Sequence, residues 1–357
     1  MADVSSDPRL RQLDGATVLV TGGGGLVGSR IVAQLAAAGA RPLVLDRFDA
    51  YPHPVRDRFE VDRHAAEVVL GDVRERATVN WLARRADFVV HAAAYADVAA
   101  CTRRPDIAFA SNVHGTQVLL DAVAGAAVKR LVFVSSASVY GNGLPVGDGP
   151  SRFAEDQPLD PISVYANTKV WAEHQVRLLL SGTGTEHAIV RYFSVYGEPQ
   201  VPKPESHSWM VPWMAMSAHT GRPIRLNGGG RQVRDMVHVE DIARATVLAL
   251  VTDRMTGRTV NVGTGVATTV RQIGELIAGH YSGAEFITTP MPAGDPRGGC
   301  ADTRLATDLL GWQPGITLAD GISRYVAWLK VTPGAIPDWF TTPPALTPAT
   351  TSAALAA

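Results

Sequence analysis

The feature that most constrains the fold is a glycine-rich turn between an apolar run and a helical pattern near the start of the chain. Residues 16–21 read ATVLVT, residues 22–28 read GGGGLVG and residues 29–39 read SRIVAQLAAAG. A β-branched run, a glycine turn and a helical period in this order are typical of the opening of a βαβ unit. Such a turn lets backbone N–H groups and a helix N-terminus approach a pyrophosphate closely. The sequence therefore predicts a strand, a turn and a helix around a candidate phosphate site.

The glycine spacing gains meaning from an acidic residue further along the chain. Gly22, Gly25 and Gly28 form GxxGxxG, a pattern that alone also fits a flexible turn. Asp46 ends the next apolar run, where a carboxylate can accept hydrogen bonds from an adenosine ribose and disfavour a 2′-phosphate. The expected cofactor is therefore NAD rather than NADP, although Arg47 next to it could accommodate that phosphate.

Apolar runs alternate with helical patterns through the first half of the chain. The expected strands are RPLVLD (41–46), AEVVLGD (66–72), ADFVVHAAA (86–94), KRLVFVSSAS (129–138) and AIVRYFSVYG (188–197). Between them lie segments such as ATVNWLARR and NVHGTQVLLDAVAGA, which have helical periodicity. Strands this apolar, alternating with helices, predict an α/β fold, with a doubly wound parallel sheet of the Rossmann type covered on both faces.

The character of the sequence changes after residue 193. A Pro-rich loop, EPQVPKPESHSW (198–209), is followed by shorter helical and strand patterns. We expect a dinucleotide-binding domain over 14–193, with 233–265 contributing to it, and a smaller substrate lobe over 194–330. The remainder, 331–357, is rich in Pro, Ala and Thr and is expected to be a flexible tail, whose start Trp339 and Phe340 could pin to the surface.

Composition excludes several classes of protein. The net charge is −1 without a long basic run, so neither nucleic acid nor a membrane surface is an expected partner. Cys101 and Cys300 are too few and too far apart to predict a disulfide framework or a metal site. The chain shows neither an apolar run of transmembrane length nor a signal pattern, so we expect a cytoplasmic protein that acts on a small molecule.

Lysine is scarce, which makes one lysine notable. The 33 basic residues include only four lysines, Lys129, Lys169, Lys203 and Lys330. Lys169 follows Tyr165 by four residues in SVYANTKVW, which places the two on one face of a helix. There a compact, mobile ammonium could lie beside a phenol or a sugar hydroxyl, as a planar arginine could not.

An ordered set of motifs extends over residues 14–330. The set consists of Gly22/Gly25/Gly28, Asp46, Gly71-Asp72-Val73, His91 to Ala94, Asn112, Ser135 to Gly141, Tyr165/Lys169, Arg191-Tyr192-Phe193 and Arg234-Asp235. With these motifs the chain resembles the extended short-chain dehydrogenase/reductases, and most of all their branch of NAD-dependent nucleotide-sugar epimerases and dehydratases that resemble UDP-galactose 4-epimerase.

The resemblance implies roles for individual residues. Tyr165 would be the catalytic base, Lys169 would bridge to the nicotinamide ribose, and Ser136 would bond the reacting hydroxyl. Asp72 and Val73 would lie against the adenine. The implied cofactor-binding residues are Gly22, Gly25, Leu26, Val27, Gly28, Asp46, Arg47, Asp72, Val73, Ala92, Ala93, Asn112, Tyr165, Lys169 and Tyr192.

The tyrosine must be activated to act as a base at neutral pH. A free tyrosine has a pKa of about 10. A nearby ammonium and a positive nicotinamide ring favour the phenolate, so we expect them to lower the pKa of Tyr165 toward the working pH.

The reaction within this family follows from the residues after the catalytic serine. Related 4,6-dehydratases carry Asp-Glu there, and related decarboxylases have a glutamate at the position of Ser138. Here Ala137 and Ser138 follow Ser136. We therefore expect 4-epimerisation of a nucleotide sugar through a keto intermediate, with NAD retained. Two alternatives stay open: an NAD-dependent dehydrogenase, reductase or dehydratase on a related or non-nucleotide sugar, and a non-catalytic NAD-binding module.

The substrate segments depart from the family pattern. Ser194 replaces a usual asparagine, Trp209-Met210 replace Asn-Leu, and Pro292 or Ala293 replaces a diphosphate-binding arginine. Arg234 remains as a phosphate partner and Arg297 could assist, while Gly298-Gly299 lie near the position that limits sugar size. The expected substrate contacts are Ser136, Ser194, Arg234, Arg297 and Gly299. The lost phosphate contacts favour an unusual substrate, and the two glycines would leave room for a bulky C2 or C6 substituent.

The family resemblance also implies a homodimer. Relatives pair through the helix that bears the tyrosine and the helix after the asparagine, and HQVRLLL and TQVLLDAV are apolar enough for such an interface.

Overall fold

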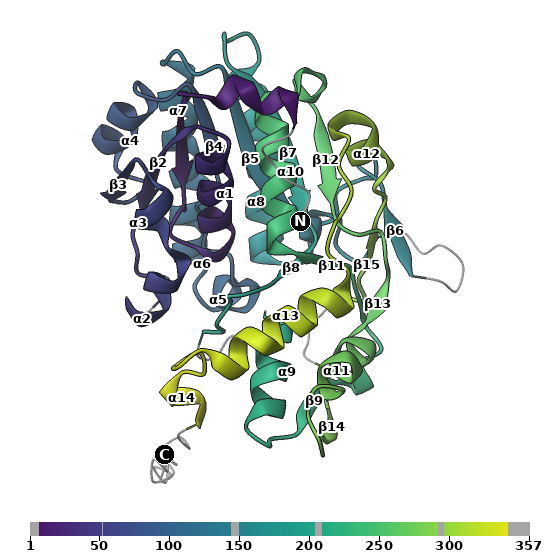
Figure 1. The fold of residues 1–357 in the computed structure, drawn as a ribbon. Coiled ribbons are helices and arrows are strands. Elements are labelled where there is room, and N and C mark those ends of the chain that lie inside the picture. Colours follow the sequence, from purple (N-terminus) through teal and green to yellow (C-terminus); the bar gives the residue numbers. More distant parts are fainter. Residues whose placement is uncertain (1–6, 52, 144–149, 204–208, 292–295, 342–357) are drawn as a thin grey trace, which may run out of the picture.

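The computed structural model describes residues 7–51, 53–143, 150–203, 209–291 and 296–341 (Figure 1). Its centre is a seven-stranded parallel sheet with the strand order β12-β7-β5-β4-β1-β2-β3. The strands are β1 (Thr17–Thr21), β2 (Arg41–Asp46), β3 (Glu67–Leu70), β4 (Phe88–His91), β5 (Arg130–Ser136), β7 (Glu186–Tyr192) and β12 (Thr259–Val262). The predicted doubly wound α/β fold is confirmed.

Helices cover both faces of this sheet, as Figure 1 shows. One layer contains α1 (Leu26–Ala37), α3 (Val61–His64) and α10 (Val239–Val251). The other contains α4 (Arg76–Ala83), α7 (Gly115–Ala124) and α8 (Val164–Leu180). Alternate strand residues enter opposite cores: Val18 and Val20 pack with the α1 layer, and Leu19 packs with the α8 layer. This burial on both sides explains why the strands read as continuous apolar runs.

The later part of the chain returns to the dinucleotide domain. Strand β12 adds to the edge of the sheet beside β7, and α10 packs against α1. Shorter helices connect the strands at the carboxyl edge of the sheet: α2 (His53–Arg56), α5 (Val98–Arg103) and α6 (Pro105–Ala108).

The expected strand 188–197 is wrong as one element, because it is divided into two strands at Phe193. Strand β7 ends at Tyr192, and β8 (Ser194–Tyr196) leaves the main sheet to pair in parallel with β11 (Met236–His238). The backbone N–H of Ser194 donates to the Asp235 carbonyl at 2.9 Å. The apolar run therefore contributes one strand to each of two sheets, and periodicity alone does not predict this division.

The smaller lobe is built from short paired strands and helices around its own core. Its strands are β6 (Ser151–Phe153), β9 (Ile224–Asn227), β10 (Val233–Arg234), β13 (Thr268–Thr269), β14 (Phe286–Thr289) and β15 (Gly299–Ala301). Its helices are α9 (Met210–His219), α11 (Val270–Ala278), α13 (Leu318–Val331) and α14 (Asp338–Thr341), whereas α12 (Arg304–Leu310) packs against β12 and α10 of the main domain. The core of this lobe joins α9, α11 and α13.

The segment after residue 330 starts with packed structure. Helix α14 lies at the end of the described chain, where Phe340 is buried and the Trp213 and Trp339 rings are 5.6 Å apart. Trp339 and Phe340, which the sequence analysis suggested as anchors, thus pack the start of the predicted tail (331–357) against the smaller lobe. Residues 342–357 lie outside the described residues. The limits of the two lobes stay a prediction.

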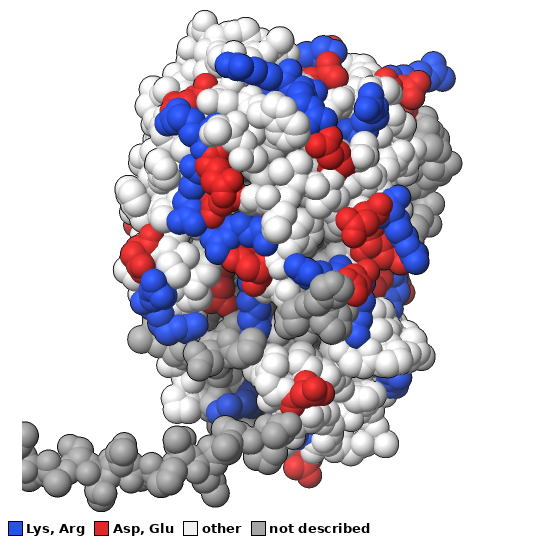
Figure 2. Space-filling view, turned by 90° about the vertical axis from the view of Figure 1, so that its left-hand side faces the viewer, with Lys and Arg blue, Asp and Glu red and all other residues white. Residues whose placement is uncertain are grey.

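Charges of both signs are interspersed on the face shown in Figure 2, and no field of one sign covers it. Among the described residues, several opposite charges form pairs over short distances, such as Arg74 with Asp72 and Arg63 with Glu60. Within the described residues, no helix has the length and apolar character needed to cross a membrane.

Candidate active site

The glycine turn has the shape that a phosphate group requires. Gly22 has φ +77°, and a Cβ there would lie 2.6 Å from the Ala93 nitrogen. A Cβ on Gly28 would lie 2.1 Å from the Gly22 carbonyl oxygen. Helix α1 begins after Gly25 without a side-chain cap, which leaves the first N–H groups of the helix, including those of Leu26 and Val27, for an anion. The cradle therefore fits the pyrophosphate of a dinucleotide.

Asp46 lies beside this turn at the end of β2. One of its carboxylate oxygens accepts from the Gly24 N–H at 2.9 Å and the other accepts from Phe48 N–H at 2.7 Å. Burial raises the pKa of Asp46, and these backbone hydrogen bonds oppose the shift. The carboxylate is thus held next to the turn, where a ribose hydroxyl could donate to it.

Arg47 points to other carboxylates. Its guanidinium donates to Asp72 at 3.2 Å and also pairs with Asp49. These two acidic partners compete with any 2′-phosphate, so the arrangement favours NAD.

The ends of β3 and β4, which lie beside β2 and β1 in the sheet, complete the carboxyl edge at this site. Asp72 and Val73 follow β3, and Ala92 and Ala93 follow β4. The Ala92 N–H donates to the Thr21 carbonyl at 3.0 Å, which fixes this loop against β1. These predicted cofactor residues therefore share the carboxyl edge of the sheet, where ligands bind in doubly wound folds.

Asn112 holds the loop after β4 to the helix that carries the tyrosine. Its side-chain oxygen accepts from the Tyr95 N–H at 2.7 Å, and its amide donates to the Thr168 hydroxyl at 3.1 Å. The residue lies in a π-helical segment, Phe109–His114. Its contacts within the protein are those of a support for α8.

Ser136 and Tyr165 meet where β5 ends and α8 begins. The Ser163 hydroxyl caps α8 by accepting from the Ala166 N–H at 3.1 Å, so Tyr165 stands in the first turn. The Ser138 hydroxyl donates to the Ser136 hydroxyl at 2.9 Å. The Ser136 side chain acts on the Tyr165 phenol in the direction that lowers its pKa. The structure thus brings together the predicted acid/base and its hydroxyl partner.

Lys169 is buried one turn after Tyr165. Its ammonium donates to the Val134 carbonyl at 2.8 Å and lies 5.8 Å from the centre of the Tyr165 ring. Burial lowers the pKa of Lys169 to about 8. An ammonium in this place is available to a ribose hydroxyl and to the electrostatics of the phenol.

The protein groups alone do not activate the tyrosine. Burial raises the pKa of Tyr165, and the hydrogen bond with Ser136 lowers it only in part. The expected lowering therefore depends on the positive nicotinamide ring together with Lys169, because desolvation by itself favours the neutral phenol.

A buried ionic network behind the site was missed by the sequence analysis. Glu173, one turn after Lys169, pairs with Arg191 at 2.7 Å and accepts from the Ser135 hydroxyl at 2.6 Å. Arg191 donates onward to the Tyr140 hydroxyl at 2.7 Å. Burial alone would raise the pKa of Glu173, but hydrogen bonds and charge from Arg191 lower it. The glutamate at one-turn spacing from Lys169 was the available signal.

Tyr192 points to the opposite face of the sheet from Arg191. Its side chain is buried and its hydroxyl bonds the Thr246 hydroxyl of α10. A part in cofactor binding would therefore fall to its backbone or to the edge of its ring.

Apart from Ser136, which ends β5 of the main sheet, the predicted substrate residues follow the break at Phe193. The Arg234 guanidinium donates to the Pro296 carbonyl at 3.1 Å, and Arg297 is exposed while its N–H donates to Asn142 at 3.0 Å. A Cβ on Gly299 would lie 2.2 Å from the Ser151 carbonyl oxygen, because β15 pairs closely with β6. Strand pairing thus requires Gly299 whatever the size of the sugar. Pro292 and Ala293 lie outside the described residues.

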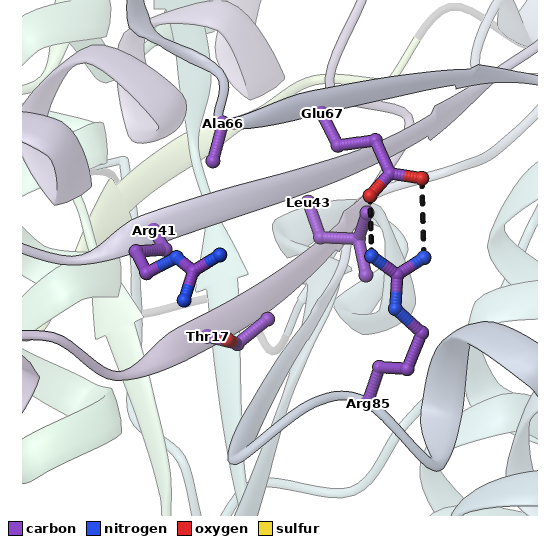
Figure 3. Close-up of a pocket in the computed structure, with 6 residues that line it drawn as sticks. All are labelled: Thr17, Arg41, Leu43, Ala66, Glu67 and Arg85. Carbon is purple, nitrogen blue, oxygen red and sulfur yellow. Dashed lines mark hydrogen bonds and ion pairs between the residues drawn. The ribbon is translucent and has the colours of Figure 1, made fainter.

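A separate depression of about 300 Å³ lies at the opposite edge of the sheet (Figure 3). It is lined by Thr17, Arg41, Leu43, Ala66, Glu67 and Arg85. The Arg85–Glu67 ion pair crosses it, and the strands there present their amino ends. Ligands of doubly wound sheets bind at the carboxyl ends, so this depression is unrelated to the site above.

The fold, the glycine cradle and the Ser136/Tyr165/Lys169 arrangement define a dinucleotide-dependent enzyme of the extended short-chain dehydrogenase/reductase class. The model of the NAD dependent epimerase/dehydratase family matches residues 18–263. The chain belongs to this family, and NAD is its cofactor.

Individual relatives extend over nearly the whole chain. A UDP-glucose 4-epimerase of Lactobacillus helveticus is 33% identical over 343 residues, which cover 90% of this chain and 99% of the relative. A dTDP-glucose 4,6-dehydratase of Mycolicibacterium smegmatis is 32% identical over 327 residues, 88% of this chain and 93% of the relative. The structure of a Thermus thermophilus UDP-glucose 4-epimerase in complex with NAD is similar at a TM-score of 0.79 and 30% identity, covering 88% of this chain and 99% of that one.

Proposed function

We propose that the protein catalyses the 4-epimerisation of a nucleotide-diphosphate sugar. The observation that carries this proposal is the pairing of an intact Ser136/Tyr165/Lys169 arrangement with the absence of a carboxylate from the two positions after Ser136. The relatives named above include both epimerases and a dehydratase, so the choice between them depends on this segment.

The chemistry of elimination needs a second acid and base near the sugar. Position 137 is an alanine, and the Ser138 hydroxyl is turned to Ser136. The buried Glu173 is neutralised by Arg191, and the Glu155 carboxylate accepts from the Asn261 N–H at 2.7 Å. None of these groups is placed to remove water, which leaves return of the hydride as the simplest outcome.

In this reaction Tyr165, Ser136 and Lys169 have separate roles. NAD held by the glycine cradle and Asp46 would supply a reversible hydride acceptor for C4 of the sugar. Tyr165 takes the proton of the 4-hydroxyl and later gives it back, while the Ser136 hydroxyl bonds the reacting oxygen. Lys169 holds the ribose and favours the phenolate. Turning the keto sugar in the pocket before the hydride returns gives inversion at C4.

The substrate is proposed to be an uncommon sugar nucleotide. Arg234 and Arg297 supply cationic donors for a diphosphate, while Ser194 and Trp209 depart from the family pattern. The alternative that keeps the same site is an NAD-dependent dehydrogenase or reductase, which would change the redox state of the sugar.

We also propose that the protein works as a homodimer in the cytoplasm. Helices α7 and α8 pack together, with the Gln175 amide donating to Gln117 at 2.7 Å, and Leu178 on α8 is 71% exposed. The two cysteines are free and buried, as suits a reducing compartment. Sedimentation at equilibrium should give twice the chain mass, and Leu178→Arg should reduce it to the monomer mass if α8 forms the interface.

Product analysis tests the proposed reaction. The protein, with and without added NAD, is incubated with a panel of UDP-, dTDP- and GDP-sugars, and products are followed by mass spectrometry and proton NMR. The expected result is an unchanged mass with inverted coupling at C4. Loss of water or of two hydrogens would replace epimerisation with dehydration or oxidation, and turnover of no sugar by an NAD-loaded protein would favour a binding module.

A further inference from the structure

Ser138 lies in the short helical turn that continues the chain from the end of β5. This turn, η5 (Ala137–Tyr140), begins directly after Ser136 and packs against α8. Residues 136–138 are half-buried, whereas the residues on either side of these three are buried. Ser138 therefore shares with Ser136 the part of this segment that remains open to a ligand.

The side-chain oxygen of Ser136 accepts two hydrogen bonds from Ser138. The Ser138 N–H donates to it at 3.2 Å, and the Ser138 hydroxyl donates to it at 2.9 Å. A serine oxygen has two acceptor lone pairs and one O–H donor. Both acceptor positions are thus filled from residue 138, which leaves the Ser136 proton free to point elsewhere. Toward a bound sugar, Ser136 is therefore a donor and not an acceptor.

The turn that carries Ser138 is fixed by the residue at its end. Tyr140 is buried, and its ring stacks on the Phe153 ring with 5.0 Å between the ring centres. The Tyr140 hydroxyl donates to the Asn261 side chain at 2.7 Å. The Gly141 N–H closes the turn by donating to the Ser138 carbonyl at 3.1 Å. The backbone of Ser138 is thus held in place by the protein itself.

A Ser136 that can only donate suits each stage of the proposed reaction. Negative charge grows on the 4-oxygen of the sugar as its proton and its hydride leave, and a donor aimed at this oxygen stabilises that charge. In the keto intermediate the same oxygen is a carbonyl, which only accepts. The hydrogen bonds that Ser136 accepts also polarise its O–H group and strengthen the bond that it donates.

We propose that Ser138 is a positioning residue that directs the proton of Ser136 toward the reacting oxygen of the sugar. This inference rests on the proposed function, in which Ser136 bonds that oxygen. Ser138 acts through Ser136 and needs no contact of its own with the sugar or with NAD.

A double-mutant cycle tests whether the two serines act as a unit. Its members are Ser136→Ala, Ser138→Ala and the double variant, and Ser138→Thr is the conservative replacement. Ser217→Ala is the matched control, because the Ser217 hydroxyl donates to the Trp213 carbonyl at 2.8 Å within α9. For each full-length variant, kcat and KM are measured with a sugar that the wild type turns over, and NAD affinity is measured by calorimetry. The reduction of bound NAD by the sugar is followed by absorbance.

Loss of one neutral hydrogen bond predicts that Ser138→Ala lowers kcat roughly 3- to 10-fold. KM and NAD affinity should stay unchanged, because neither ligand contacts Ser138. Ser138→Thr keeps the hydroxyl and should retain most of the wild-type kcat, and Ser217→Ala should match the wild type. In the Ser136→Ala background, Ser138→Ala should have no further effect.

Additive losses in the double variant overturn the proposal, because they mean that Ser138 acts without Ser136. So does a wild-type kcat in Ser138→Ala, an equal loss in Ser138→Thr, or a loss confined to KM, which would make Ser138 a substrate contact. Failure of the proposed function has a different signature: a wild-type protein that oxidises its sugar without epimerising it contradicts 4-epimerisation. The cycle can still be measured in that case on the reduction of NAD, and non-additive losses there would support the role of Ser138.

Discussion

The dinucleotide domain and the substrate lobe differ in whether their backbone N–H groups are hydrogen-bonded within the protein. At the glycine turn, α1 starts without a side-chain cap and leaves its N–H groups open. In the smaller lobe, α11 starts with a capping box: the Thr269 hydroxyl accepts from the Gln272 N–H at 3.1 Å, and the Gln272 side chain accepts from the Thr269 N–H at 2.8 Å. The first region is organised for a ligand, and the second satisfies its own backbone. A cofactor common to a family needs a fixed cradle, whereas a lobe that meets varied sugars needs a stable frame.

The largest expected effect concerns the chemistry that lies between these regions. Tyr165→Phe should lower turnover by at least ~3 orders of magnitude, because it removes a positioned acid/base. NAD affinity should stay within a few-fold of the wild-type value, as measured by calorimetry. Tyr281→Phe is the control, since the Tyr281 hydroxyl is buried without a hydrogen-bond partner. Near-normal turnover in Tyr165→Phe would remove this residue from the mechanism.

Two glycines of similar crowding sharpen the comparison of the regions. Gly28→Ala should weaken NAD binding about 100-fold or more, because its Cβ would press on the Gly22 carbonyl inside the cradle. In Gly299→Ala the new Cβ would lie at nearly the same distance from the Ser151 carbonyl oxygen. This variant should have a lower melting temperature and an unchanged NAD affinity. Calorimetry and thermal unfolding separate the two effects. Equal losses of NAD affinity would mean that the lobes are not independent in this respect.

Glu173→Gln tests the ionic network behind the site. Breaking a buried ion pair leaves Arg191 without its counter-charge, so the free energy of unfolding should fall by about 3 kcal/mol in urea denaturation. The matched change is Glu67→Gln, which breaks the surface pair with Arg85 shown in Figure 3 and should have no measurable effect. A stability loss of the same size in both variants would contradict the assignment of Glu173 as a buried support.

The smallest effect is a pH dependence from His91. Burial lowers the pKa of this residue to about 3, and it bonds the Thr21 and Thr116 hydroxyls at 2.7 and 2.9 Å. Its unfolded pKa is about 6.5, so on acidification the unfolded state takes up a proton first. Stability is therefore lost as pH falls from about 6.5 toward 3, at up to ~1.4 kcal/mol per unit. His91→Gln should remove this part of the slope in urea denaturation between pH 7 and 5; an unchanged slope would refute it.

The two regions also differ in how far the sequence predicts them. The cofactor edge could be predicted because its signals are local: glycines within one turn, Asp46 at a strand end, and Tyr165 and Lys169 on one helix face. The pairing of β8 with β11 and of β6 with β15 joins segments far apart in the chain, and no periodicity records such contacts. The role of Glu173 could not be predicted for the same reason, since it depends on Arg191 and Ser135 from other elements.

Isotope transfer at C4 tests the central claim, a transient 4-keto sugar whose hydride returns to the same carbon. A nucleotide sugar that the protein turns over is prepared with deuterium at C4 and incubated with the NAD-loaded enzyme in ordinary water. If the hydride returns to C4, the epimerised product keeps its deuterium there, and no solvent hydrogen enters the sugar ring. Loss of the label from C4, or entry of solvent hydrogen at C5, would contradict hydride return and point to elimination or to exchange with free cofactor.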